Sequence, residues 1–260
     1  MSLREYKTDT PQYHFYKEQH KTQTYDYVSD KLRQYQNLGN AKFEMSMNLA
    51  LKIMDSFIDP SDPDIHSENS LHAYQTAERI RKQYPDDKAL QVCGLIHDLG
   101  KVLFAFGEPS LAVVGDTYVV GCKFPESIVY YETMKENPDF NNPLYSTDYG
   151  IYNPNCGIEN LKLSFGHDEY LYQVLQNNYG HNLPHKLQNI IRFHSFYPWH
   201  TGKDYAHLMR PGDEIIMQDV LNFNQFDLYS KEDADFVLTD EIKQYYENLL
   251  KEFFPQPLKW

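Results

Sequence analysis

The sequence predicts an all-α protein, a single-domain helical bundle with loops and at most a short hairpin. Three observations favour this fold class. Apolar residues recur at three- and four-residue steps in many segments, which is the period of an amphipathic helix. Several of these segments follow a residue type that commonly caps a helix. The only extended run, VVGDTYVVG, is short. The chain has 260 residues, of which 41% are hydrophobic, and this content allows a sizeable core without disulfides.

The predicted helices follow one another along the chain, over residues 43–57, 71–84, 88–99, 168–177, 184–193, 213–223 and 240–253. The first three follow Asn40, Ser70 and Asp87, which can cap them. Pro184 fits the first turn of its helix, because its missing N–H costs nothing there. Residues 106–160 are rich in Gly, Pro, Asn and Asp, so we expect loops and short pieces. Without an internal repeat or a linker, one domain is expected.

Charge and cysteine content disfavour several classes of protein. The formal net charge is −13 with no basic block, so we expect neither a nucleic-acid nor a membrane partner. The N-terminal stretch has no apolar run long enough for a signal peptide, and no window approaches about 18 apolar residues. The three cysteines show no CxxC or paired-ligand spacing, which is typical of a reducing compartment. We therefore expect a cytoplasmic protein.

Five polar residues from different segments extend apolar stripes toward the interior: His72, His97, His167, His194 and Asp227. A single histidine on such a stripe is more often a hydrogen-bonded core residue than a ligand. Five converging segments are harder to explain in that way. We therefore expect these residues to meet in a functional site.

Asp98 stands beside His97 in the apolar run CGLIHDLGKVLFAFGEP. Burying an isolated carboxylate costs on the order of several kcal/mol unless it is paired or bound to a metal. Two aspartates and four imidazoles are nitrogen and oxygen ligands without a thiolate, a set that suits Fe, Mn or Zn. The side chains of consecutive helical residues point about 100° apart. His97 and Asp98 can therefore both reach one ion only if it lies between these two directions.

The order His72, then His97-Asp98, then Asp227 resembles the H…HD…D signature of the HD-domain superfamily, mostly metal-dependent phosphohydrolases on an all-helical bundle. A His-Asp pair alone is a weak motif. More specific blocks are similar to the myo-inositol oxygenase family: GLIHDLGKVLFAFGEP, AVVGDTYVVGC, YSTDYGIYNPNCG, SFGHDEYLYQV and IRFHSFYPWHTGKDY. This resemblance covers nearly the whole chain.

The resemblance implies two irons, in a mixed-valent Fe(II)/Fe(III) working state. One iron would take His72, His97, Asp98 and Asp227. The other would take His167, His194 and the same Asp98, whose carboxylate would bridge the pair. The implied reaction is the O2-dependent four-electron ring cleavage of myo-inositol to D-glucuronate. No organic cofactor is expected, in keeping with the absence of a GxGxxG fingerprint.

The resemblance also implies catalytic and substrate contacts. Lys101 matches the lysine of the family's HDxGK stretch and would act beside Asp98; the competing reading is a surface lysine near a helix end. The other implied substrate contacts are Arg4, Asp59, Pro60, Ser61, Gly115, Asp116, His194 and Ser195. Ordinary turns could also explain Asp59 and Gly115-Asp116. Arg4 would belong to an N-terminal arm, residues 1–28, that covers the site of an HD-domain-like catalytic domain, residues 29–260.

Two other functions compete with an oxygenase. An HD-type phosphohydrolase would share four of the ligands but would need extra Arg or Lys to hold phosphate. Near the motifs the sequence offers only Arg79, Lys101 and Arg192. A catalytically inactive helical binding module predicts the loss of a ligand, yet all six positions are present. We therefore expect an inositol oxygenase that acts as a monomer on myo-inositol and O2.

Overall fold

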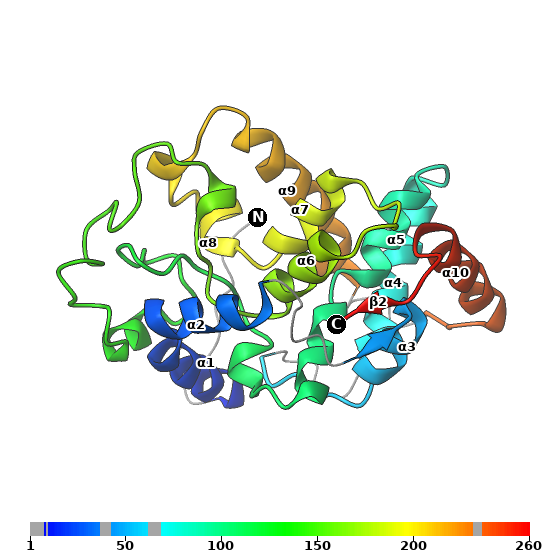
Figure 1. Cartoon of the computed structure of the whole chain (residues 1–260), viewed down its shortest axis with the longest axis horizontal. Helices are drawn as coiled ribbons and strands as arrows, with labels where there is room; N and C mark the ends of the chain where they lie inside the picture. The colour runs from blue at the N-terminus through cyan, green and yellow to red at the C-terminus, as the bar shows by residue number, and fades with distance from the viewer. Residues whose placement is uncertain (1–7, 9, 37–42, 62–68, 231–235) are drawn as a thin grey trace.

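Helices make up nearly all the regular structure of the computed structural model, which confirms the all-α prediction (Figure 1). The structure describes residues 8, 10–36, 43–61, 69–230 and 236–260. The α-helices are α1 (Pro11–Thr22), α2 (Tyr25–Tyr35), α3 (Met47–Met54), α4 (Asn69–Gln83), α5 (Lys88–Ile96), α6 (His167–Asn177), α7 (His185–Phe193), α8 (Tyr197–His200), α9 (Asp213–Ser230) and α10 (Asp240–Phe253). The shorter 3-10 helices are η1 (Leu99–Phe106), η2 (Ser110–Ala112), η3 (Tyr131–Glu136), η4 (Ile158–Asn160) and η5 (Ala206–Leu208).

The centre of the fold is formed by α4, α5, α6, α7 and α9. Helix α4 packs on α5 and α9, α6 packs on α7 and η1, and α7 packs on α9. Their inward faces share one hydrophobic core that includes Ile80, Ile96 and Phe223. Because burial of apolar surface drives this packing, polar residues that extend the apolar stripes are brought together at the centre. Figure 1 shows α10 at the right edge of this bundle and long loops at its left.

Capping side chains set where several helices begin. Asp87 caps α5 as predicted, since its carboxylate accepts the N–H of Leu90 at 2.9 Å. The prediction for the start of α3 is wrong: this helix begins after Ser46, whose hydroxyl oxygen accepts the N–H of Leu49 at 3.2 Å. The predicted cap, Asn40, lies outside the described residues. The residues just before Ser46 are extended because they pair with another strand.

Helix α4 begins at Asn69, so Ser70 is not its cap as predicted. Asp55, at the end of α3, instead accepts hydrogen bonds from both the N–H and the hydroxyl of Ser70, each at 2.8 Å. The Asn69 amide donates to two carbonyls near the end of α3. A contact between two helices therefore replaces the predicted local cap, and it fixes the start of α4 just before His72.

Two later helices differ from their predicted bounds, whereas α6 and α10 closely match theirs. Pro184 is the residue that precedes α7 rather than part of its first turn. Helix α9 continues beyond Phe223, its predicted end, to Ser230. This extension carries Asp227 one turn beyond Phe223, on the same side of the helix.

The chain changes helix type at His97 and Asp98. Helix α5 ends at Ile96, and η1 continues from Leu99, so the prediction of one helix up to Gly100 is wrong in its last turn. A Cβ atom at Gly100 would lie 2.0 Å from the backbone oxygen of His167. Only glycine therefore allows η1 to pack this closely against α6.

The stretch Lys88–Phe106 is long and apolar enough to cross a membrane by length and composition, which corrects the expectation that no such window exists. Within the protein, 72% of this window is buried. It also contains the break between α5 and η1 and the buried polar side chains of His97, Asp98 and Lys101. These features are those of a core helix that carries a polar site.

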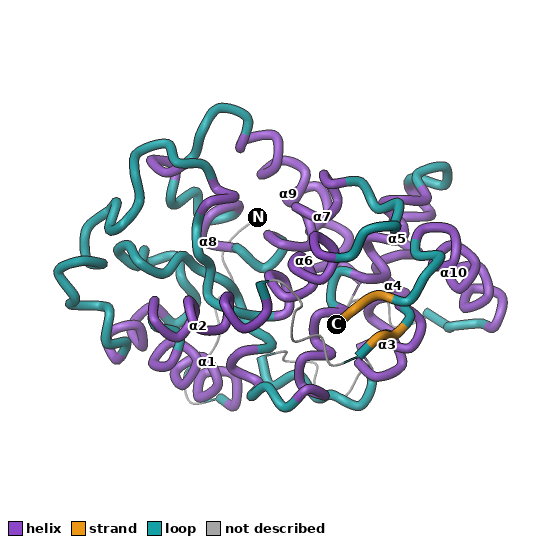
Figure 2. The backbone as a smooth tube through the Cα atoms, viewed as in Figure 1, coloured by secondary structure: helices purple, strands orange, loops and turns teal. Residues whose placement is uncertain are grey.

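A small sheet joins segments far apart in the sequence, so it is not a hairpin (Figure 2). Strand β1 (Glu44–Met45) pairs antiparallel with β2 (Leu258–Lys259). The VVGDTYVVG run contributes only an isolated bridge between Val119 and Leu163, and the surrounding segment consists of loops and short 3-10 helices as predicted. Helix α1 packs on η2 and η3. The division into an arm, 1–28, and a domain, 29–260, stays a prediction.

We expect Gly100→Ala to lower the free energy of unfolding by roughly 3 kcal/mol, the upper end of the cost of overpacking. The added methyl group meets the backbone of His167, which cannot move aside without shifting α6. Urea denaturation measures the effect. Gly166→Ala is a matched control, since its Cβ would meet Val113 at an ordinary 3.5 Å. Wild-type stability of Gly100→Ala would contradict this close approach.

A second prediction concerns His20 on α1, which is fully buried with its Nδ1 2.6 Å from the hydroxyl of Thr133. Burial lowers the pKa of His20 to about 3. As the pH falls below about 6.5, the unfolded chain gains a proton that the folded chain does not, so stability is lost by up to about 1.4 kcal/mol per pH unit. The urea midpoint of His20→Asn should therefore depend less steeply on pH between about 6 and 4.5. Identical slopes in the two proteins would refute this.

Candidate metal centre

Five segments bring the predicted ligands to one place in the core. The six residues are His72 on α4, His97 and Asp98 at the junction of α5 and η1, His167 at the start of α6, His194 directly after α7, and Asp227 on α9. The side chains of His72 and Asp227 are the most accessible, at 13% and 11% exposure, and the other four are almost completely buried. The predicted convergence is therefore present in the folded chain.

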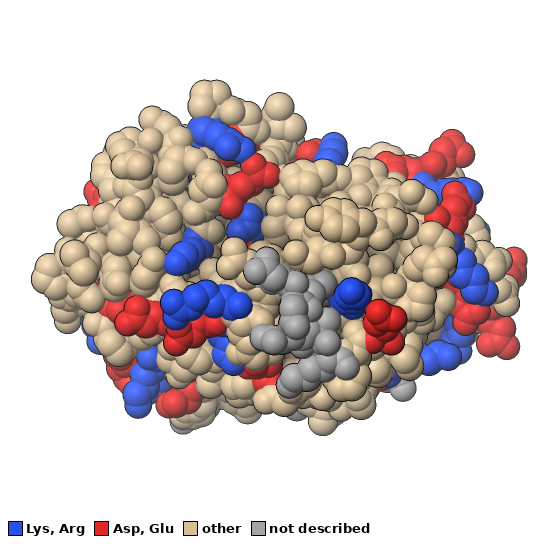
Figure 3. Space-filling view, viewed as in Figure 1, with Lys and Arg blue, Asp and Glu red and all other residues tan. Residues whose placement is uncertain are grey.

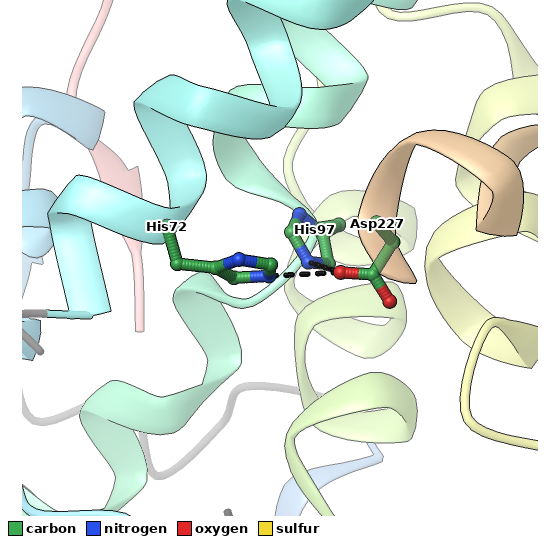
Figure 4. Close-up of side chains that lie close together, drawn as sticks. All are labelled: His72, His97 and Asp227. Carbon is green, nitrogen blue, oxygen red and sulfur yellow. Dashed lines mark hydrogen bonds and ion pairs between the residues drawn. The ribbon is translucent and has the colours of Figure 1, made fainter. Parts of the chain in front are cut away.

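His72, His97 and Asp227 form one half of the cluster. Figure 4 shows the three side chains, from α4, the α5–η1 junction and α9, pointing toward one another. The Oδ1 atom of Asp227 lies 2.8 Å from Nε2 of His72 and 3.3 Å from Nε2 of His97. The ligand atoms of these residues lie within 4.8 Å of one another, close enough to hold one ion.

Asp98 joins this half to a second one. Its Oδ1 lies 3.1 Å from Nε2 of His167 and 3.6 Å from Nε2 of His194. Its Oδ2 faces the first half and lies 3.6 Å from Nε2 of His97. The two oxygens of one carboxylate thus face different groups of imidazoles, which is the arrangement that a bridging ligand requires.

Backbone carbonyls orient three of the imidazoles. The Nδ1 atoms of His97, His167 and His194 each lie 2.8 Å from a carbonyl oxygen, those of Gly94, Val113 and Ile191 respectively. A proton on Nδ1 leaves Nε2 as the free lone pair, and Nε2 is the atom that faces the cluster. Nε2 of His167 is buried without a hydrogen-bond partner. A cation would satisfy it, so the residues present fit a metal ion.

The carboxylates of this cluster are ionised. Burial raises the pKa of Asp98, but the positive charge of Lys101 and the neighbouring imidazoles outweigh it and hold the pKa well below its usual range. Burial also raises the pKa of Asp227, but the nearby imidazoles of His72 and His97 outweigh this effect and leave the pKa well below its ordinary value. The site therefore offers two negative charges to a cation in a poorly solvated place.

Lys101 belongs to this site and is not a surface lysine. It is 7% exposed, and its Nζ lies 2.9 Å from Oδ2 of Asp98 and 3.0 Å from Oδ2 of Asp59. Because a 3-10 helix has three residues per turn, Lys101 lies directly over Asp98. Burial alone would lower the pKa of Lys101, but the two carboxylates raise it above its ordinary value, so the ammonium group stays protonated.

A pocket opens over the cluster, and most of the predicted substrate contacts line it: Asp59, Ser61, Lys101, Gly115, Asp116, His194 and Ser195. Pro60 is not among the lining residues, and Arg4 lies outside the described residues. The carboxylate of Asp59 accepts from the N–H and the hydroxyl of Ser61, at 2.9 and 2.6 Å. Asp59 is therefore both part of a local turn and a partner of Lys101 in the pocket.

Helix α1 supports the turn that carries Asp116. Gly115 has a φ of 102°, which favours glycine, and a Cβ there would lie 2.6 Å from the side chain of Gln19 on α1. The Gln19 amide donates to the carbonyl of Val114 at 2.8 Å. On the other side, the carbonyl of Ser195 accepts the N–H of the residue after Asp116 at 2.9 Å. These contacts hold Asp116 and Ser195 on neighbouring walls of the pocket.

Sequence reasoning missed three residues of the site. Tyr16 and Tyr197 line the pocket. The Tyr16 hydroxyl lies 3.2 Å from both Oδ1 and the backbone nitrogen of Asp116, a contact that no periodicity in the sequence indicates. Asp168 is buried directly behind His194. The sequence does contain a feature that indicates Asp168, because His167-Asp168 repeats the His-Asp pair of His97-Asp98.

His200 supports the backbone of a ligand. It is fully buried, and its Nε2 lies 3.1 Å from the carbonyl oxygen of His194. The amide of Asn224 on α9 donates to the same oxygen at 3.0 Å. The backbone of His194 is thus held from α8 and from α9.

An all-α bundle that buries four histidines and two aspartates, with a His-Asp pair at a helix junction, is the arrangement of HD-type metal-dependent proteins. Sequence comparison is more specific. The profile of the family described as myo-inositol oxygenase matches residues 10–260. The chain therefore belongs to the myo-inositol oxygenase family.

Individual relatives agree with this assignment. Inositol oxygenase of Sus scrofa is 46% identical over 246 residues, which are 94% of this chain and 86% of that protein. Inositol oxygenase 1 of Arabidopsis thaliana is 47% identical over 249 residues, 95% of this chain and 79% of that protein. Inositol oxygenase of Dictyostelium discoideum is 46% identical over 250 residues, 94% of this chain and 85% of that protein.

The geometry predicts that Asp98 and Asp227 differ in their effect on metal binding. Asp98→Ala removes an oxygen from each half of the cluster, so it should weaken every bound cation. The loss should exceed the roughly 10–100-fold cost of losing an outer-shell partner. Asp227→Ala should weaken only the half that contains His72 and His97. Calorimetric titration with Zn(II) measures both, with circular dichroism to check folding. Wild-type affinity in Asp98→Ala would contradict the bridging geometry.

Proposed function

We propose that this chain is an inositol oxygenase that opens the ring of myo-inositol with O2 and releases D-glucuronate. The observation that carries this proposal is the match of the family over residues 10–260, together with the meeting of all six implied ligands in one buried cluster. The reaction removes four electrons from the substrate and needs one molecule of O2. One oxygen atom enters the new carboxylate, and the other leaves as water.

The proposed metals are two irons in the Fe(II)/Fe(III) state. His72, His97 and Asp227 would hold one, and His167 and His194 would hold the other, with one oxygen of Asp98 on each. Support comes from the donor set, which contains imidazoles and carboxylates without a thiolate. It also comes from the two oxygens of Asp98, which face different imidazoles. When bound, the iron pair supplies the electron transfer and the O2 binding that no side chain here provides.

The chain's own residues would bind and orient the polyol. A neutral cyclitol offers no charge, so several hydrogen bonds from fixed groups must set its orientation. The pocket offers carboxylate acceptors at Asp59 and Asp116 and a hydroxyl at Ser195. Lys101 stays protonated between two carboxylates, which makes it a hydrogen-bond donor to a substrate oxygen and not a base.

The phosphohydrolase alternative is less well supported by the pocket. Among its described lining residues, four are aspartates and Lys101 is the one lysine or arginine. Arg79 lines a different cavity, between α4, α9 and α10, and Arg192 is held by Glu169 at 2.7 Å. On the face seen in Figure 3, basic and acidic side chains are interspersed without a continuous basic surface. A phosphate ester would therefore meet more negative than positive charge.

The proposal extends to where and how the protein works. We propose a cytoplasmic monomer that acts on small molecules. Cys93, Cys122 and Cys156 are free thiols, two of them buried, which suits a reducing compartment.

The test is O2 uptake by iron-loaded, mildly reduced protein, with glucuronate assayed in parallel. We expect uptake that depends on myo-inositol, one glucuronate for each O2, and a loss of more than about 100-fold in His97→Ala, because a ligand is gone. His185→Ala, which removes an exposed histidine on α7, is the control that should keep wild-type rates. If protein with its irons bound shows no inositol-dependent O2 uptake, the proposal is contradicted, and phosphate esters would then be assayed.

A further inference from the structure

Asp168 is a buried carboxylate to which the proposed function gives no role. It lies on α6 directly after His167 and is 1% exposed. Its Oδ1 lies 2.9 Å from Nδ1 of His194, 3.2 Å from the hydroxyl of Ser195, and 3.3 Å from Nε2 of His167. Its Oδ2 is buried without a hydrogen-bond partner. A charge buried at this cost requires an explanation.

The ring nitrogen that Asp168 contacts defines its place in the site. His194 faces Oδ1 of Asp98 with Nε2, at 3.6 Å, and faces Asp168 with Nδ1. Asp168 therefore contacts the His194 ring at the nitrogen that does not face the bridging carboxylate. The Nδ1 atoms of His97 and His167 have only backbone carbonyls as hydrogen-bond partners among the described residues. His194 alone of these three has a carboxylate in addition to its carbonyl, that of Ile191.

A carboxylate behind a ligating imidazole has a known physical effect. It accepts the Nδ1–H hydrogen bond, which fixes the tautomer and the ring orientation and makes Nε2 a stronger donor to the metal. A hydrogen bond with a charged acceptor is stronger than one with a neutral carbonyl. The half of the cluster that contains His194 therefore has a reinforcement at this imidazole that His97, among the described residues, does not have.

We propose that Asp168 is a positioning residue that holds His194 with Nε2 toward the metal and raises the metal affinity of that half of the cluster. The hydroxyl of Ser195, on the wall of the pocket, donates to the same oxygen of Asp168. One carboxylate thus fixes both a ligand and the adjacent substrate contact. This inference rests on the proposed two-metal site.

The first experiment is calorimetric titration of the full chain with Zn(II), which suits imidazole and carboxylate ligands and needs no redox chemistry. Wild type should bind two ions. In Asp168→Asn, one of the two sites should weaken about 10–100-fold, the cost of losing an outer-shell partner, and the other should keep its affinity. Unchanged affinity at both sites, or an equal loss at both, would overturn the inference. A single ion in wild type would instead contradict the two-metal proposal.

Asp139→Asn is the matched control for the loss of a buried carboxylate. Asp139 is 7% exposed and accepts the N–H of Tyr25 at 2.6 Å, outside the metal cluster. This variant should melt at a lower temperature and bind Zn(II) with wild-type affinity at both sites. If Asp139→Asn also weakens one site 10-fold or more, on the order of the effect expected for Asp168→Asn, the effect of Asp168→Asn is not specific and the inference fails.

A spectroscopic measurement separates positioning from general stability. In Zn(II)-loaded protein with 15N-labelled histidine, the Nδ1–H of His194 should give a downfield, exchange-protected proton resonance, because it is hydrogen-bonded to a carboxylate. In Asp168→Asn this resonance should move upfield, while those of His97 and His167 stay in place. A His194 resonance at the same position in both proteins would overturn the inference, since Asp168 would then not accept this proton.

Discussion

The buried carboxylate of Asp98 is the group on which the rest of the site depends. Its charge is tolerable in the core only because partners approach it from several sides. Lys101 lies over it from the next turn, His97 precedes it, and His167 and His194 reach it from α6 and α7. If any of these elements moved away, the carboxylate would keep its cost of burial and lose part of its compensation. The central helices must therefore stay packed around Asp98 for this carboxylate to remain ionised in the core.

The change of helix type at this point gives the carboxylate its partners. A continued α-helix would turn Lys101 partly away from Asp98, whereas the 3-10 turn places the two side chains in line. The same turn brings Gly100 against the backbone of His167, so the approach of η1 to α6 and the position of a ligand are set together. A single glycine thus connects backbone packing to the geometry of the cluster.

Much of the fold, and the ligand set, could be predicted from the sequence, because each relevant residue extends an apolar stripe within its own helix. Asp227 is an example, found from its spacing even though the predicted end of α9 was too early. Interactions between elements were not predictable in this way. The start of α4 depends on Ser70 meeting Asp55, 15 residues before it. The contact of Asp168 with His194 depends on which ring nitrogen faces the core, and sequence spacing carries no information on that.

The cluster brings together parts of the chain that are very far apart in sequence, since His72 and Asp227 are separated by 155 residues. A cation held by both would act as a reversible cross-link, and closing so long a loop is a large restriction on the unfolded chain. Binding to the folded state alone would add about 2.7 kcal/mol of stability at a free metal concentration 100 times the dissociation constant. The melting temperature would then depend on metal supply, and a cell short of metal would hold a chain more open to proteolysis.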